Sequence, residues 1–511
     1  KNRNLILFIK KQNIVIPLYF KIIMINTSYK KNKILYLILS ILFAITIQQL
    51  PLFQGNSLHL IHAIKNFELN KLQNDWMANT TNHLPLFTIF NHFLIKLASL
   101  KIIYLIHFCL LSLCSLFLFL ICKTKFEDLN NPYLSIIWFS IFTIIYHENS
   151  FFGGVAGQDV INEGYQPASF GVLFFVGLYF FLINKNFYSI LFICLAASFH
   201  PTYVLHSGFL LLGIFTYYVV KKEYATLIRV SIIYFILILP ITLYIIINFF
   251  FIDKNLILEG QKILLDRAVH HAVIQSWFSY KDLISISIYL ISLMIIFEKK
   301  KFFVPFLVFG FASIIFSFTQ FFIQSNTLAL SFPWRSSVFL IPISTMIIFS
   351  FLIKLFFVQK KYLKILSIIL IFFSISFFSI KNHLIENSNK IFYTKMKLVK
   401  KIRENYINID RLLIPVYLED IRLNVGIPIF VDWKHPPFKF NEIIEWKKRM
   451  TLALAFFKTT EFDQRKLILN DINKIENITH ILISKKDFAN NCKDLINDKK
   501  YALISVDECF K

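Results

Sequence analysis

Acidic side chains stand in two of the polar loops that separate the long apolar runs of this sequence. Asp75 lies in the segment Asn74-Asp75-Trp76, and Asp159 and Glu163 lie four residues apart in a second loop. A carboxylate beside a membrane can act as a general base toward an acceptor hydroxyl, or hold a divalent metal that neutralises a phosphate. The alternatives are a solvated or helix-capping Asp75, and a tight hydrogen-bonded turn around Asp159 and Glu163.

Arginine and histidine side chains occur in other loops of the same kind. His200 lies at a break between two apolar runs, Arg267 and His270 lie in a third polar loop, and Arg335 opens a later apolar run. Both residue types suit phosphate recognition, and an arginine can donate two parallel hydrogen bonds to one phosphate. The alternatives are a satisfied histidine beside a helix-breaking proline, the polar face of a helix on the membrane, and a snorkelling interfacial arginine.

Glycine is concentrated in the loop that carries Asp159. Four of the twelve glycines of the chain fall between Phe152 and Pro167. In a chain so poor in glycine, this concentration predicts unusual backbone angles or the close approach of a ligand.

Composition places these loops on a membrane protein. Apolar residues make up 56% of the 511 residues and charged residues only 16%, whereas soluble domains have about a quarter charged residues. The net charge of +24 fits short lysine-rich turns that orient helices in a membrane. We do not expect nucleic-acid binding, because no basic patch alternates with exposed aromatic residues.

The positions of the lysine-rich turns predict a topology. Placing all of them on the inner side gives eleven spans, with the N-terminus inside and the C-terminus outside. The expected spans are 34–53, 102–122, 132–147, 167–184, 187–200, 201–220, 227–252, 283–298, 302–323, 337–357 and 362–380. The segment Leu84–Leu100 carries polar residues, and we interpret it as an interfacial or re-entrant helix rather than a span.

This topology divides the chain into three parts. Residues 1–33 form a cytoplasmic segment, of which 1–23 precede Met24 and are treated as a translated upstream stretch or an incomplete end. Residues 34–380 form a polytopic membrane domain of a multi-pass inner (cytoplasmic) membrane protein. Its outer loops are 54–83, 148–166, 253–282 and 324–336. Residues 381–511 form an extracytoplasmic α/β domain.

The C-terminal domain shows shorter apolar runs than the rest of the chain. Strands are expected at Leu412–Val416, Pro428–Val431 and His480–Ser484, and helices at Glu442–Phe457 and Thr460–Leu469. Strands that alternate with helices predict a small α/β fold. Cys492 and Cys509 could form a disulfide if this face is oxidising, whereas the other four cysteines lie in apolar runs.

Several motifs of this chain resemble a group of bacterial membrane proteins defined only by a domain of unknown function. The matching pieces are His200-Pro201-Thr202-Tyr203, Phe332-Pro333-Trp334-Arg335, Ile421-Arg422 through Val431-Asp432-Trp433-Lys434, and Glu445-Trp446. In layout the chain also resembles the GT-C superfamily of membrane glycosyltransferases. That resemblance implies many spans, an acidic residue in the first outer loop and a donor sugar linked to polyprenyl phosphate.

The resulting hypothesis is glycosyl transfer on the outer face from a polyprenyl-phosphate-linked donor. We expect Asp75 to be the base, and Asp159 and Glu163 to bind the acceptor or a divalent cation such as Mg²⁺ or Mn²⁺. The lipid phosphate would contact His200, Arg267, His270 and Arg335. The first loop has Asp75 as its single aspartate and contains no Asp-x-Asp or Glu-x-Asp pair, which weighs against a metal-dependent mechanism. A flippase of lipid-linked saccharides and a non-catalytic envelope assembly protein are the alternatives.

Overall fold

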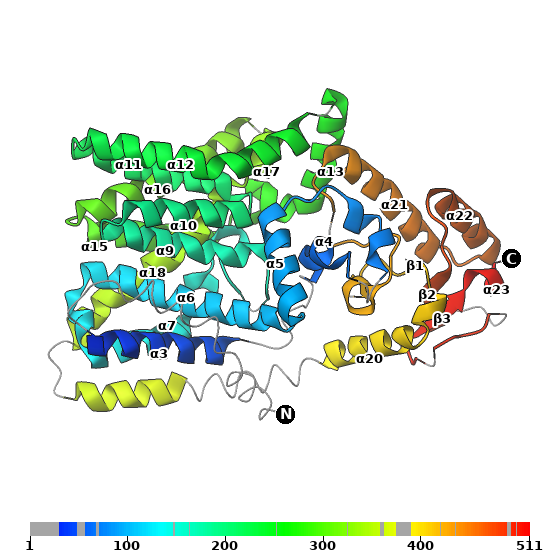
Figure 1. Cartoon of the computed structure of the whole chain (residues 1–511), viewed down its shortest axis with the longest axis horizontal. Coiled ribbons are helices and arrows are strands. Elements are labelled where there is room, and N and C mark those ends of the chain that lie inside the picture. Colours follow the sequence, from blue (N-terminus) through cyan, green and yellow to red (C-terminus); the bar gives the residue numbers. More distant parts are fainter. Residues whose placement is uncertain are drawn as a thin grey trace.

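The computed structural model describes most of the chain. The described residues are 30–48, 57–67, 71–146, 149–162, 164–251, 253–323, 325–357, 362–374, 390–419, 421–434, 436–487, 492–496 and 498–510. The structure is mainly helical, with a small sheet near the C-terminus. Figure 1 shows the long helices side by side in one bundle, and the C-terminal elements beyond one end of it.

The bundle is built from apolar helices of unequal length. They are α3 (Lys30–Ile47), α5 (Pro85–Ala98), α6 (Ile102–Lys125), α7 (Pro132–Ile145), α9 (Val172–Leu182), α10 (Asn186–Phe199), α11 (Tyr203–Val220), α12 (Tyr224–Ile245), α15 (Tyr280–Ile296), α16 (Lys300–Ile323), α18 (Ser337–Phe357) and the helix Leu363–Ser374. One continuous apolar core joins most of them. These apolar helices indicate a membrane protein.

The expected count of eleven spans is not supported. Five described helices are long and apolar enough to cross a membrane, namely Ile102–Lys125, Tyr203–Val220, Tyr224–Phe250, Lys300–Ile323 and Asn326–Phe357. Six other apolar helices have only 10–17 residues, whereas a span needs about 20. One of them, Pro167–Leu182, already includes the 3₁₀ turn Pro167–Gly171 that precedes α9.

Lysine-rich turns gather at one end of the bundle. Lys125 lies 3.4 Å from Glu298, Lys354 lies 3.6 Å from Asp128, and Lys301 donates a hydrogen bond to Asn184. The short helices α4 (Ile61–Ile64), α14 (Ile274–Trp277) and α17 (Asn326–Leu330), together with α13 (Lys254–Ala272), belong to the polar loops. Figure 1 shows α4, α13 and α17 at the end nearest the C-terminal elements. Helix α5 lies near that same end (Figure 1), and the interpretation of this segment as interfacial remains a prediction.

The C-terminal unit consists of α20 (Lys390–Glu404), α21 (Phe440–Lys458), α22 (Phe462–Ile475), α23 (Val506–Cys509) and a three-stranded sheet. Strand β1 (Leu412–Leu413) pairs in parallel with β2 (His480–Ser484), which pairs antiparallel with β3 (Tyr501–Ser505). The predicted α/β fold and its helices at 442–457 and 460–469 are confirmed. The segment Pro428–Val431 adds only an isolated bridge between Leu412 and Ile429.

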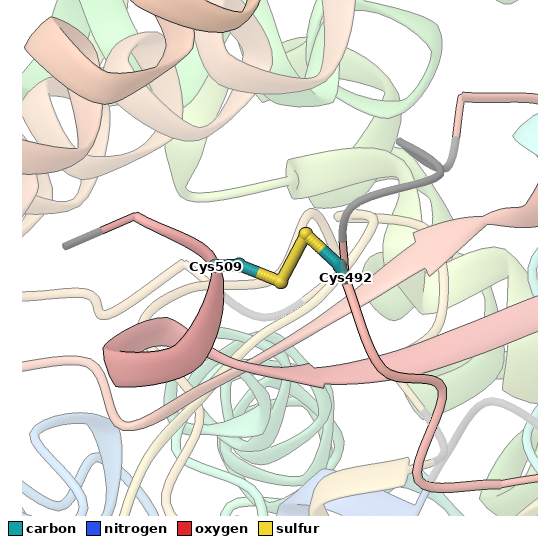
Figure 2. Close-up of a disulfide and its surroundings, with 2 residues drawn as sticks. All are labelled: Cys492 and Cys509. Carbon is teal, nitrogen blue, oxygen red and sulfur yellow. A yellow bond between two sulfur atoms is a disulfide. The ribbon is translucent and has the colours of Figure 1, made fainter.

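Both faces of this sheet are covered. Ile481 and Ile483 of β2 pack on one side with α21 and α22, whereas Leu482 packs on the other side with α20. Such alternation follows from the two-residue period of a strand. Cys492 and Cys509 are joined by a disulfide with Cα atoms 5.2 Å apart (Figure 2), so the pairing left open by the sequence is present in this structure.

Candidate functional site at the loop end of the bundle

Asp75 is fully buried in an ion-pair network with the C-terminal unit. Its Oδ2 lies 3.1 Å from Nε of Arg422 and accepts a hydrogen bond of 2.9 Å from the backbone amide of Ile429. Its Oδ1 accepts a hydrogen bond from the amide of Ala78. Arg422 also donates to Asp432, so one guanidinium is shared by two carboxylates. Burial opposes the charge of Arg422, but these two carboxylates raise its pKa above the usual value.

Other residues of the same polar loop, the first in the chain, also contact the C-terminal unit. Lys71 donates to the carbonyl of Ile409 at 2.7 Å and lies 3.0 Å from Asp410. The amide and hydroxyl of Thr81 both donate to Oε1 of Glu442, each at 2.8 Å. The described part of this loop is therefore bound to the C-terminal unit by several independent contacts.

The glycine-rich second loop packs against the ends of α15 and α18. A Cβ atom on Gly154 would lie 2.6 Å from Oγ of Ser337, so only glycine fits this approach. The Ser337 hydroxyl accepts a hydrogen bond from the amide of Val155, and Asp282 accepts one from the amide of Ala156. Ala156 and Gly157 have φ values of 58° and 62°. The prediction of unusual backbone angles in this loop is confirmed, and the group that approaches Gly154 closely is Ser337 of the same chain.

Arg335 lies between the second loop and the α10–α11 junction. Its Nη2 donates to Oε1 of Gln158 at 2.9 Å, and its Nη1 donates to Oγ1 of Thr202 at 3.2 Å. Gln158 in turn donates from Nε2 to Nδ1 of His271 at 3.0 Å. Thr202 contacts Nδ1 of His200 at 2.5 Å. No carboxylate of a described residue forms an ion pair with Arg335.

The two imidazoles that end these relays are both uncharged. Burial and the charge of Arg335 keep the pKa of His200 well below its ordinary value. Burial, His270 and Arg335 lower the pKa of His271 to about 4. The site therefore has one fixed positive charge beside two neutral imidazoles.

Asp159 belongs to the same region. Tyr203 lies within electrostatic reach of both Asp159 and Arg335. Burial raises the pKa of Asp159 to about 6, and its carboxylate accepts no hydrogen bond from any described residue. A carboxyl group with a pKa near neutrality is suited to accept and release protons.

Helix α13 connects this site to the C-terminal unit. Arg267 donates to the backbone carbonyl of Trp433 at 3.2 Å, and its guanidinium lies 4.6 Å from the centre of a Trp433 ring. A Cβ atom on Gly260 would lie 2.7 Å from Phe440, so glycine allows close contact between α13 and α21. His270 packs beside His271, with ring centroids 4.0 Å apart.

The structure thus divides the predicted site residues into two groups. Arg335, His200 and Asp159 lie at one place, while Asp75 lies in the interface with the C-terminal unit. Arg267 and His270 stand between the two groups on α13. Glu163 lies outside the described residues, and among those described no three His, Cys, Asp or Glu side chains form a group able to hold a metal.

Sequence reasoning did not assign roles to Gln158, Thr202, His271, Arg422 or Asp432. Gln158 and Thr202 stood beside predicted residues, but their role depends on a contact across more than 130 positions of sequence. Arg422 and Asp432 lie in the most specific stretch of the resemblance, from Ile421 to Lys434. This stretch was the feature of the sequence that could have pointed to a role for them.

Replacing Arg422 with Met should strongly weaken the contact between residues 71–81 of the first polar loop and the C-terminal unit. The substitution leaves two buried carboxylates without their cation, which costs about 3–5 kcal/mol. Hydrogen exchange in residues 71–81 of the detergent-solubilised protein should increase by at least tenfold. As a control, Lys474→Met removes an exposed pair with Asp471 and should change little. Equal exchange in both variants would contradict a structural role for the network.

Replacing Asp159 with Asn should stabilise the protein in a pH-dependent way. Because the folded-state pKa is raised from 3.8 to about 6, the stabilisation from protonated Asp159 is present below pH 3.8 and lost as the pH rises through 6. The variant should therefore gain up to about 3 kcal/mol over the parent protein at pH 8. Near pH 4 the melting temperatures of the two proteins should converge. A difference independent of pH would contradict the burial of this carboxyl group.

Comparison with known families gives one match, in the C-terminal unit. Residues 395–453 match a family described as "Domain of unknown function (DUF6798)". The matched stretch runs from α20 into α21 and includes Arg422, Asp432 and Trp433. No curated protein matches the chain. The C-terminal unit, which holds the partners of Asp75, thus contains a DUF6798 domain.

Proposed function

We propose that this protein transfers a sugar from a polyprenyl-phosphate-linked donor to an acceptor hydroxyl at the outer face of a membrane. The observation that carries the proposal is that, among the residues the structure describes, no carboxylate forms an ion pair with Arg335. This guanidinium is held by two neutral acceptors, Gln158 and Thr202.

A comparison of two arginines supports an anionic ligand. Arg422 is fully buried, and two carboxylates balance its charge. Arg335 is partly buried, and no carboxylate of a described residue balances its charge. Removing a cation from water without a counter-ion is costly, so a bound phosphate would supply the missing charge. Guanidinium groups fit phosphate oxygens well.

The surroundings of Arg335 support a lipid-linked phosphate. Arg335 immediately precedes the apolar helix α18, and Trp334 beside it packs on Trp277 with ring centroids 5.2 Å apart. Tryptophan is enriched where a membrane meets water. A phosphate at this depth can remain attached to a chain within the bilayer.

Asp159 takes the role of base in this proposal. It would accept the proton of the acceptor hydroxyl while the hydroxyl oxygen bonds to the anomeric carbon. The bond between that carbon and the phosphate oxygen breaks, and the phosphate leaves with the electron pair beside Arg335. Asp75 instead positions the first loop, because both of its oxygens are engaged by Arg422 and backbone amides. No step is assigned to a metal, although Mg²⁺ or Mn²⁺ bound by Asp159 and Glu163 stays a prediction.

The proposal keeps the GT-C-like layout and the predicted orientation. The loop end with the C-terminal unit would face outward, where a disulfide between Cys492 and Cys509 fits an oxidising compartment. Eleven crossings would require short apolar helices, such as α7, to complete spans in a locally thinned bilayer.

Replacing Arg335 with Gln tests the proposal. The variant keeps a polar side chain but removes the charge, so binding of undecaprenyl phosphate by protein in nanodiscs should weaken by at least tenfold. Arg403→Gln is the matched control, because Arg403 is exposed on α20.

Transfer can be followed in the same preparation with radiolabelled undecaprenyl phosphoryl sugars. Loss of label from the lipid, prevented by Asp159→Asn, is the expected result. Tight binding without any loss of label would contradict a transferase and favour transport of lipid-linked saccharides. Equal binding by the Arg335→Gln and parent proteins would overturn the phosphate site.

A further inference from the structure

We propose that Trp433 and Phe438 form a saccharide-binding subsite on the C-terminal unit, facing the Arg335 site. This inference rests on the proposed function and deepens it, because it locates the sugar rather than the phosphate. It assigns a binding role to residues of the DUF6798 domain.

The first observation is exposure. Trp433 is 45% exposed and Phe438 is 42% exposed, although Phe430 and Trp446 in the same unit are buried. Both exposed rings belong to the short connection between the buried Asp432 and the start of α21. Both rings are therefore accessible to a ligand on a segment that begins at a buried ion-pair network.

The second observation is the contact that each ring makes. Trp433 stacks on Arg267 of α13, and His271, four residues further along the same helix, contacts Gln158. Phe438 packs on His83 of the first polar loop, with ring centroids 4.2 Å apart. The Trp433 ring is therefore about one helical turn from the residue that holds Arg335 through Gln158.

The third observation is that the backbone carrying Trp433 is held firmly. The amide of Trp433 donates to the carbonyl of Val416 at 2.9 Å, and its own carbonyl accepts from Arg267. The preceding residue, Asp432, is fixed by Arg422, and its carbonyl accepts from the indole of Trp446 at 3.0 Å. A preorganised ring loses little entropy when a ligand binds.

The chemistry of this surface fits a pyranose ring. One face of such a ring presents C–H groups, which pack on the electron-rich face of an aromatic side chain. Its hydroxyl groups need hydrogen-bond partners, and Arg267 and the imidazoles stand beside the two rings. A protein partner would be expected to cover a larger continuous apolar patch, whereas here each ring alternates with a charged or polar group.

Binding of four lipids by the full-length protein in nanodiscs tests this subsite. The probes are undecaprenyl phosphate and its glucosyl, mannosyl and N-acetylglucosaminyl phosphodiesters. The parent protein should bind at least one phosphodiester about tenfold more tightly than the bare phosphate. Trp433→Ala and Phe438→Ala should each remove most of this preference and leave affinity for the bare phosphate unchanged.

Phe462→Ala is the matched control, because Phe462 is 41% exposed on the same unit but lies at the start of α22, where it stacks on Phe510. This variant should keep the full preference for the phosphodiester. Trp433→Phe retains a ring over Arg267 and should keep part of the preference for the phosphodiester. This variant distinguishes a loss of ring stacking from a loss of folding.

The outcomes distinguish the two proposals. If bare phosphate binds through Arg335 but no sugar increases the affinity, the subsite is overturned and the phosphate site stands. Equal preference in the Trp433→Ala, Phe438→Ala and Phe462→Ala proteins overturns the subsite in the same way. If the parent protein binds none of the lipids, the proposed function itself fails.

Discussion

The ion-pair network of Asp75, Arg422 and Asp432 fixes how the two parts of this protein meet. Burying one cation and two anions is unfavourable unless all three meet with good geometry, so this interface has little tolerance for displacement. Asp75 comes from the first polar loop of the bundle, whereas its partners come from the C-terminal unit. The network therefore orients the unit against the loop end of the bundle, and places Trp433 over Arg267 of α13.

The same side-chain type serves two different purposes in this structure. Arg422 is balanced by carboxylates and holds the fold together, whereas Arg335 is held by an amide and a hydroxyl and keeps its net charge. The two imidazoles behind those acceptors are kept neutral, so they orient Arg335 without competing for an anion. Helix α13 links both places, because His271 touches the Arg335 relay and Arg267 touches the C-terminal unit.

The sequence predicted the arrangement of this protein better than its interactions. Lysine-rich turns predicted which loops lie together, and glycine content predicted the constrained loop around Gly154. The predicted count of eleven spans is not supported, because six of the described apolar helices have only 10–17 residues. Strand β3 was missed, since its apolar run is short and follows a polar stretch. Nothing near Asp75 in the sequence indicates that its partner Arg422 lies almost 350 residues away. The catalytic role expected for Asp75 remains a prediction, and the proposed mechanism does not use it.

The central claim is that Arg335 carries an unbalanced charge reserved for a lipid-linked phosphate. Gln158→Glu tests it most directly, because it places a carboxylate where an amide oxygen now lies 2.9 Å from the guanidinium and so imitates the pairing of Arg422. The account predicts a folded protein whose affinity for undecaprenyl phosphate in nanodiscs falls by at least tenfold. Unchanged affinity in a correctly folded Gln158→Glu protein would contradict it.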